Sequence, residues 1–129
     1  MIKFGYTILY VQDVEKSMSF YERAFGFARK FIAGEMYGEL ITGETTLSFA
    51  SVALAKTNLK NGFAESALSQ KPFAMEIGFT TANVREVYEK AIAEGAMPEA
   101  EPELKPHGQT VAYVRDPDGF LVEICTPMD

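Results

Sequence analysis

The chain has 129 residues, of which 47% are hydrophobic and 23% charged, and these are the proportions of an ordinary globular domain. It contains no apolar run approaching the roughly 18 residues of a membrane-spanning helix, and the N-terminal stretch MIKFGYTILYV lacks the features of a signal peptide. Its 12 Lys and Arg residues are scattered, and the net charge of −6 argues against binding to nucleic acid. We therefore expect a cytoplasmic protein of one domain, 1–129, that binds neither nucleic acid nor a membrane.

The first half of the chain predicts a strand, a helix and a hairpin. A β-type run through Tyr6 and Tyr10 leads to Asp13, which is a good helix N-cap, and the amphipathic segment after it ends at Gly26. Four apolar residues form one face of that helix: Val14, Met18, Tyr21 and Phe25. The stretch EMYGELITGETTLSFAS then alternates and turns at Thr42-Gly43-Glu44, which is typical of a β-hairpin.

The second half repeats this plan. Shifting the sequence by about 70 residues lays YTILYVQDVEKSMSFYERAFGF over EIGFTTANVREVYEKAIAEGA, with Asn83 and Gly95 in the places of Asp13 and Gly26. The apolar face of the second predicted helix consists of Val84, Val87, Tyr88 and Ala91. The closing stretch GQTVAYVRDPDGFLVEICT turns at Asp116-Pro117-Asp118-Gly119, where Pro sets φ and Gly supplies a positive φ.

Each half therefore predicts a βαβββ module. We expect module 1 over about 1–52, module 2 over about 73–129, and between them a linker, 53–72, that can include a short helix. One helix covers only one face of its sheet, so the other face must be covered by the twin module or close around a ligand. The predicted fold is α+β, with two βαβββ modules in tandem forming a curved, cleft-enclosing mixed sheet.

Period-two alternation places two glutamates on the inner face of this sheet. Ile77 and Phe79 would face the helix, which leaves Glu76 on the opposite side, and the same rule sends Glu123 inward. Further residues expected on the inner faces are Tyr6, Ile8, Tyr10, Thr46, Ser48, Ala50, Gly78, Thr80, Leu121 and Cys125. A buried carboxylate must bind a metal, pair with a cation such as Arg115, accept hydrogen bonds, or stay protonated. We assign no chemistry to Cys125, which is typical of a small buried apolar residue.

Three stretches resemble the vicinal oxygen chelate superfamily, which includes glyoxalase I, bleomycin-resistance proteins and extradiol dioxygenases. They are ILYVQDVEKSMSFYERAFGF, EIGFTTANVREVYEKAIAEGA and PHGQTVAYVRDPDGFLVEICTP, and together they cover nearly the whole chain. The resemblance implies the paired-module fold, a small-molecule cleft and pairing of two chains as a homodimer, for which open sheet edges give a physical reason.

In metal-dependent relatives, two residues of each half hold the ion, usually two histidines and two glutamates. Carried over by position, the resemblance assigns these places to Tyr6, Ser48, Glu76 and Glu123. The usual histidines are absent, which argues against nickel or zinc, whereas Glu76 and Glu123 could hold a hard divalent ion such as Mg or Mn. The only histidine, His107, lies with Gln109 in the loop before the last hairpin, where relatives have residues that border the cleft.

Three functions remain open. The first is a glyoxalase-like lyase or isomerase, in which Glu123 or Glu76 abstracts a proton next to a carbonyl and Tyr6 donates to the developing enolate. The second is a non-enzymatic, bleomycin-resistance-like protein that sequesters a cationic, partly planar ligand against Tyr6 and Tyr10. In both, Ser48, His107 and Gln109 would be ligand-binding. The third is a family member whose cleft binds another metabolite or has lost its activity.

Overall fold

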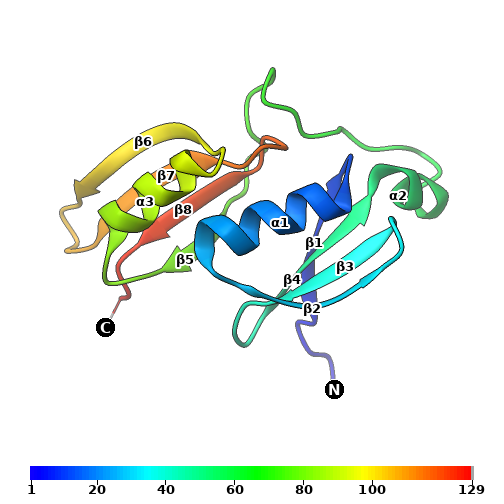
Figure 1. The fold of residues 1–129 in the computed structure, drawn as a ribbon, viewed down its shortest axis with the longest axis horizontal. Coiled ribbons are helices and arrows are strands. Elements are labelled where there is room, and N and C mark those ends of the chain that lie inside the picture. Colours follow the sequence, from blue (N-terminus) through cyan, green and yellow to red (C-terminus); the bar gives the residue numbers. More distant parts are fainter. Residues whose placement is uncertain (129) are drawn as a thin grey trace. The chain divides into compact units, whose positions relative to one another are not determined.

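The computed structural model describes residues 1–128 and divides into two compact units, Met1–Glu65 and Ser66–Asp129. Each unit contains one four-stranded mixed sheet with a long helix against it (Figure 1). The elements of unit 1 are β1 (Tyr6–Val11), α1 (Val14–Phe25), β2 (Ala28–Ala33), β3 (Tyr37–Ile41), β4 (Thr46–Ser51) and α2 (Val52–Asn58). Those of unit 2 are β5 (Ile77–Thr80), α3 (Val84–Ala93), β6 (Met97–Leu104), β7 (Thr110–Arg115) and β8 (Leu121–Cys125).

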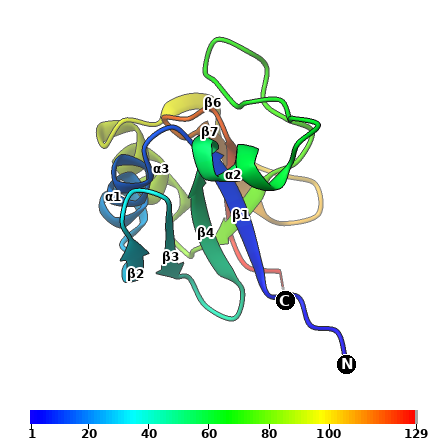
Figure 2. The ribbon, with the colours of Figure 1, turned by 90° about the vertical axis from the view of Figure 1, so that its right-hand side faces the viewer.

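The two sheets have the same strand order, β1-β4-β3-β2 and β5-β8-β7-β6. The first and last strands of each unit, β1 with β4 and β5 with β8, are parallel, and the other pairs are antiparallel. Figure 2 shows β1 and β4 side by side. The α+β fold with two tandem βαβββ modules, predicted from the internal repeat, is confirmed.

The caps predicted for α1 are confirmed, whereas α3 differs at both ends, and its C-cap residue is Glu94 rather than Gly95. The side chain of Asp13 accepts a hydrogen bond from the backbone N–H of Lys16 at 3.1 Å, and Gly26 ends α1 in the left-handed conformation with φ 76°. Asn83 occupies the equivalent N-cap position of α3, but its side chain makes no capping hydrogen bond. The first backbone N–H groups of α3 therefore lack the side-chain partner that those of α1 have.

The core of unit 1 lies between α1 and one face of its sheet. The largest fully buried side chains there are Met18, Phe20, Tyr21, Leu40 and Phe49. A β-carbon at Gly38 in β3 would overlap the thioether of Met18, so glycine leaves room for this side chain between α1 and the sheet. Because Leu9 and Val11 are buried on this side, alternation turns Tyr6, Ile8 and Tyr10 to the opposite, open face.

Part of the expected linker is ordered against unit 1. The Ser51 hydroxyl caps the short helix α2 by accepting from Leu54 N–H at 3.0 Å. Beyond this helix, the ring of Phe63 packs on Tyr10 with 4.9 Å between centroids, and Gln12 donates to Glu65 at 2.7 Å. Residues 59–65 therefore lie along the end of β1. The compact units meet at Glu65 and Ser66, inside the stretch that lacked a periodic pattern.

The Asp116-Pro117-Asp118-Gly119 turn has a structural role. The carboxylate of Asp116 accepts from the backbone N–H groups of Asp118 and Phe120, both at 2.9 Å. The guanidinium of Arg115 donates to the carbonyl oxygens of Gly119 and Ala67, both at 3.0 Å, and to that of Leu68 at 3.4 Å. The expectation that Arg115 could pair with an inward glutamate is wrong in this respect: its hydrogen bonds go to backbone carbonyls that fasten residues 67–68 to the turn.

None of the helices formed by residues 1–128 is both long and apolar enough to cross a membrane.

Candidate functional site

Glu123 lies on the open face of unit 2, in the middle of its sheet. In the register of the strands it is opposite Gly78 of β5 on one side and Tyr113 of β7 on the other. Its neighbours Val122 and Ile124 are fully buried on the side of α3, so alternation turns Glu123 away from the helix. A β-carbon at Gly78 would be 3.6 Å from the Oε2 atom of Glu123, so glycine keeps the space beside this oxygen open.

A cluster of three ionisable side chains consists of Glu123, Glu76 and Tyr113. The Tyr113 hydroxyl donates to Glu123 Oε1 at 3.0 Å. Glu76, just before β5, is close enough for its charge to interact: burial and the charge of Glu123 raise the pKa of Glu76, and hydrogen bonding from Tyr113 opposes the rise. Burial, together with the hydrogen bond to Glu123, raises the pKa of Tyr113 to about 12, so its hydroxyl keeps its proton at neutral pH. The cluster therefore combines a phenol donor with a carboxyl group that binds a proton more readily than usual.

Cys125 borders this cluster but is a poor nucleophile. Burial is the main reason why the pKa of its thiol rises to about 11, and Glu123 adds to the effect. The thiolate is the reactive form, so this thiol stays inert at neutral pH.

The open face of unit 1 carries a second cluster. Ser48 of β4 is in register with Ile8 on one side and Glu39 on the other. The Tyr37 hydroxyl donates to Glu39 Oε2 at 2.7 Å, so each unit has one tyrosine–glutamate hydrogen bond on its open face. Tyr6 is in register with Thr46 and Tyr10 with Ala50, which places both tyrosines on this face, as expected.

Sequence reasoning missed Tyr113, Tyr37 and Glu39, although the predicted hairpins contained a signal for them. A turn centred near residue 118 puts Tyr113 opposite Glu123. A turn at residues 42–45 puts Glu39 opposite Ser48. Pairing residues across each hairpin, rather than along single strands, would have placed Tyr113 beside Glu123 and Glu39 beside Ser48.

His107 and Gln109 lie together, away from the glutamates. The exposed ring of His107 hydrogen-bonds Gln109 through Nε2 at 2.7 Å, and Gln109 in turn donates to the carbonyl of Thr126 at 2.7 Å. Gln109 precedes Tyr113 by four residues, which is about 13 Å along a strand. The structure thus joins Glu76 with Glu123, and His107 with Gln109. A role for His107 and Gln109 in ligand binding stays a prediction.

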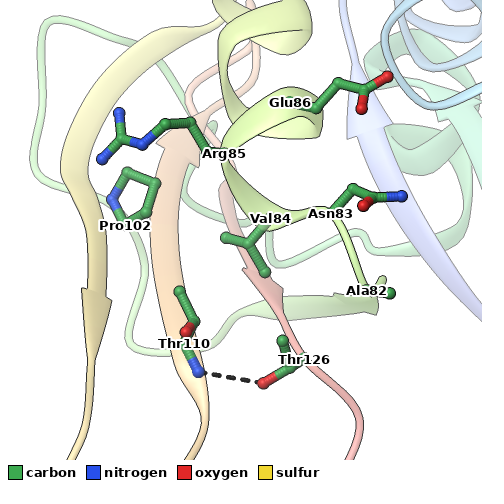
Figure 3. Close-up of a pocket in the computed structure, with 8 residues that line it drawn as sticks. All are labelled: Ala82, Asn83, Val84, Arg85, Glu86, Pro102, Thr110 and Thr126. Carbon is green, nitrogen blue, oxygen red and sulfur yellow. Dashed lines mark hydrogen bonds between the residues drawn. The ribbon is translucent and has the colours of Figure 1, made fainter.

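Two pockets lie at equivalent places, one at the N-terminus of the long helix of each unit. In unit 2 the pocket is ≈430 Å³ and lies between the start of α3, Pro102 of β6 and the hydrogen-bonded pair Thr110 and Thr126 (Figure 3). In unit 1 a pocket of ≈560 Å³ lies beside Asp13 and the start of α1. Neither is lined by Glu76, Glu123 or Tyr113, so these hollows are separate from the ionisable cluster.

Comparison with known proteins identifies the family. The sequence model of the Glyoxalase/Bleomycin resistance protein/Dioxygenase superfamily matches residues 3–124. The chain belongs to this superfamily. Among proteins with curated annotation, none matches the sequence.

Solved structures of this glyoxalase-superfamily fold match almost the whole chain. A glyoxalase-related enzyme from Fulvimarina pelagi is 24% identical with a TM-score of 0.82, and the match covers 98% of this chain and 89% of that one. A glyoxalase/bleomycin resistance protein/dioxygenase family enzyme from Burkholderia phytofirmans PsJN is 21% identical, with a TM-score of 0.83 and coverage of 98% and 100%. TioX from Micromonospora sp. ML1 is 19% identical, with a TM-score of 0.72 and coverage of 98% and 100%. At these identities the likeness establishes the fold.

The side chains that the resemblance assigns to a metal ion, Tyr6, Ser48, Glu76 and Glu123, do not fit an imidazole-based metal centre. Unit 1 supplies only two hydroxyl groups, of Tyr6 and Ser48, and the Ser48 oxygen is buried without a hydrogen-bond partner. Unit 2 supplies Glu76 and Glu123, of which Glu123 already accepts from Tyr113. Within residues 1–128 there is no group of three or more His, Cys, Asp or Glu side chains arranged to hold a metal ion. The hypothesis that Glu76 and Glu123 hold a hard ion stays a prediction.

Proposed function

We propose that this glyoxalase-superfamily protein binds a small oxygen-bearing molecule and moves a proton at a carbon next to a carbonyl, as a lyase or isomerase. The observation that supports the proposal is the cluster of Glu76, Glu123 and Tyr113 on the open face of unit 2. Two carboxyl groups in electrostatic contact, one with a raised pKa, form an arrangement in which a carboxylate is a stronger base than usual.

Glu76 is the general base in this proposal. Its carboxylate takes a proton from the hydroxyl-bearing carbon next to the carbonyl, and the electrons of the broken C–H bond form an enediolate. The same carboxyl then returns the proton to the former carbonyl carbon, while the hydroxyl proton moves to the former carbonyl oxygen and the hydroxyl-bearing carbon becomes the new carbonyl. Glu123 contributes the negative charge that raises the pKa of Glu76, which makes Glu76 the stronger base. Tyr113 fixes the orientation of Glu123 through its hydrogen bond. Tyr6, which the sequence suggested as a donor to the enolate, lies in unit 1.

The test is exchange of carbon-bound hydrogen in D₂O, followed by proton NMR. The substrates are a panel of 2-oxo and 2-hydroxy carbonyl compounds that includes the hemithioacetal of methylglyoxal and glutathione. Replacing Glu76 by Gln should lower the rate for any substrate by a factor of roughly 100 or more, which is what a general base contributes. The matched control is Glu101→Gln on the exposed strand β6, which removes the same charge away from the cluster and should leave the rate unchanged.

The Glu123→Gln variant tests the division of roles. Loss of the charge of Glu123 lowers the pKa of Glu76, so the acidic limb of the pH–rate profile should move to lower pH. A rate that is unchanged in both Glu76→Gln and Glu123→Gln would refute the proposal.

A second candidate function is ligand sequestration without catalysis. The observation that favours it is the aromatic character of the open face of unit 1: Tyr6 is exposed, Tyr10 packs on Phe63, and Phe31 packs on Tyr37 with 5.9 Å between centroids. Aromatic walls of this kind hold planar or cationic molecules. Calorimetric titration with bleomycin should then give saturable binding that survives Glu76→Gln and is lost in Tyr6→Ala. Absence of binding heat would contradict this candidate.

Pairing of two chains as a homodimer is the remaining proposal. In each sheet the outer strands, β1 and β2 in unit 1 and β5 and β6 in unit 2, have a neighbour within the sheet on one side only. Size-exclusion chromatography with light scattering should give about twice the chain mass of 14.3 kDa. A mass of one chain at micromolar concentration would contradict it.

A further inference from the structure

The open face of unit 1 is largely apolar and is exposed to solvent. Tyr6, Phe31 and Ile41 project from three different strands and are 54%, 41% and 56% exposed. Their neighbours in the sheet place all three on the side opposite α1. Glu39 of β3 lies between them and has no role in the glyoxalase-like reaction proposed for unit 2.

A hydrogen bond holds Glu39 in place on this face, whereas the partner of its other carboxylate oxygen can be replaced. Its side chain is 13% exposed, and Oε2 accepts the Tyr37 hydroxyl at 2.7 Å. The other oxygen, Oε1, is 3.6 Å from the ammonium of Lys30, whose side chain is 58% exposed. A pair with so exposed a lysine contributes little to stability, so a ligand can displace Lys30 at small cost.

The position of Lys30 results from an irregularity in β2. The register between β2 and β3 shifts between Arg29 and Phe31, so Lys30 is an extra residue. Arg29 turns toward α1, where it hydrogen-bonds Glu22 at 2.7 Å, and Phe31 turns to the open face. The bulge thus lets a lysine reach Glu39 without being part of the regular sheet.

Ser48 is a second side chain on this face that has no role in the proposed reaction. Its hydroxyl is completely buried and has no hydrogen-bond partner, which is costly inside a sheet. Ser48 is directly opposite Glu39 in the register. Tyr37 is in register with Ala50, two residues along β4 from Ser48 and on the same face. The Ser48 hydroxyl also opposes the rise that burial causes in the pKa of Tyr37, which agrees with this closeness.

We propose that Glu39, Tyr37 and Ser48 form a recognition site for an ammonium or guanidinium group carried on an apolar body. The cation of the ligand replaces Lys30 at Glu39, and its apolar body lies against Tyr6, Phe31 and Ile41. When the ligand occupies both oxygens of Glu39, the Tyr37 hydroxyl turns to Ser48, which then has the partner that it lacks in the free protein. Charge and aromatic surface act together here, because aromatic faces also attract cations.

The test uses three small probes of the same shape and different charge: benzylamine, benzyl alcohol and benzoate. Each is titrated into the ¹⁵N-labelled full chain, and backbone amide shifts of β3 and β4 are followed. Benzylamine should give saturable shifts in these strands. The neutral and anionic probes should bind at least tenfold more weakly. Equal binding of benzyl alcohol, or no saturable shift with benzylamine, would overturn the proposal.

Two substitutions act in opposite directions. Glu39→Gln keeps the shape of the side chain and should weaken benzylamine binding at least tenfold, because a charge-assisted hydrogen bond is lost. Glu44→Gln, an exposed change in the turn of the same hairpin, is the matched control and should have no effect. Lys30→Gln removes the competing cation and should strengthen binding severalfold. Unchanged affinity in either Glu39→Gln or Lys30→Gln would refute the site, and Lys30→Gln still decides if Glu39→Gln does not fold.

This inference rests on the second candidate function, ligand binding on the open face of unit 1, and does not depend on proton transfer at Glu76. Glu39 lies in unit 1, whereas the proposed catalytic cluster lies in unit 2. Amine binding without hydrogen exchange would support the recognition site and not the reaction, and exchange without amine selectivity would do the reverse.

Discussion

Replacing Gly119 by Ala should destabilise the protein through two effects that the structure separates. Gly119 has φ 94°, a conformation that side chains with a β-carbon rarely adopt. The new β-carbon would also lie 2.7 Å from the carbonyl carbon of Ala67 and 2.8 Å from its oxygen. Because both are backbone atoms, the segment at Ala67 has to move, and its hydrogen bond from Arg115 at 3.0 Å is then lost.

The size of the effect follows from these contacts. A positive φ costs a residue with a β-carbon about 1–2 kcal/mol. Loss of a hydrogen bond from a charged donor adds about 1.5–3 kcal/mol. We therefore expect the free energy of unfolding to fall by about 2.5–5 kcal/mol, which for a chain of this size lowers Tm by roughly 10–20 °C.

The assay is thermal unfolding followed by circular dichroism, with Gly108→Ala as control. Gly108 has φ 103°, but a β-carbon there would meet no atom within 4 Å, so only the backbone cost applies. This variant should lose roughly 4–8 °C. If the two variants have the same Tm within about 2 °C, contact with Ala67 and the Arg115 hydrogen bond contribute nothing, and the explanation given for the DPDG turn is refuted.

Two further predictions concern the open faces. The pKa of Glu76 in the folded protein is raised above its ordinary value of 4.5, so ionising Glu76 costs the folded state free energy. The Glu76→Gln variant should therefore have a higher Tm than the native protein at pH 7. This gain in Tm should disappear below about pH 4, where Glu76 is protonated in both the folded and the unfolded state. A gain that persists at pH 3 would show that the charge is not its cause. Ser48→Ala removes a buried hydroxyl without a partner and should raise the free energy of unfolding by about 1 kcal/mol in denaturant titration, whereas Ser51→Ala removes the cap of α2 and should lower it by about 1 kcal/mol. Two serines of one strand that change stability in the same direction would contradict this reading.

The sequence predicted the fold well because the internal repeat constrained it twice. Asp13 and Gly26 mark the ends of one helix by local chemistry, and a shift of 70 residues then located the second helix although Asn83 makes no side-chain cap. Alternation along single strands was enough to place Glu123 on the open face, because Val122 and Ile124 have to face the core.

The candidate site was predictable only in part, because its chemistry depends on contacts between strands. That Tyr113 fixes Glu123 follows from the register across a hairpin, and that Lys30 reaches Glu39 follows from a bulge. A bulge has no reliable pattern in a single sequence. The hydrogen-bond acceptors of Arg115 could not be predicted from the sequence either, because two of them are carbonyl oxygens almost 50 residues earlier in the chain.

Because the chain contains two copies of one module, comparing the copies shows which side chains the same backbone arrangement can accommodate. Ser48 and Glu123 lie at equivalent points of two sheets with the same strand order, yet one is a buried hydroxyl and the other a carboxylate held by a phenol. Helices and core fix the frame in each copy, so the side chains of the two open faces can differ without changing it. A chain built in this way can acquire a new ligand in one half while the other half keeps its chemistry.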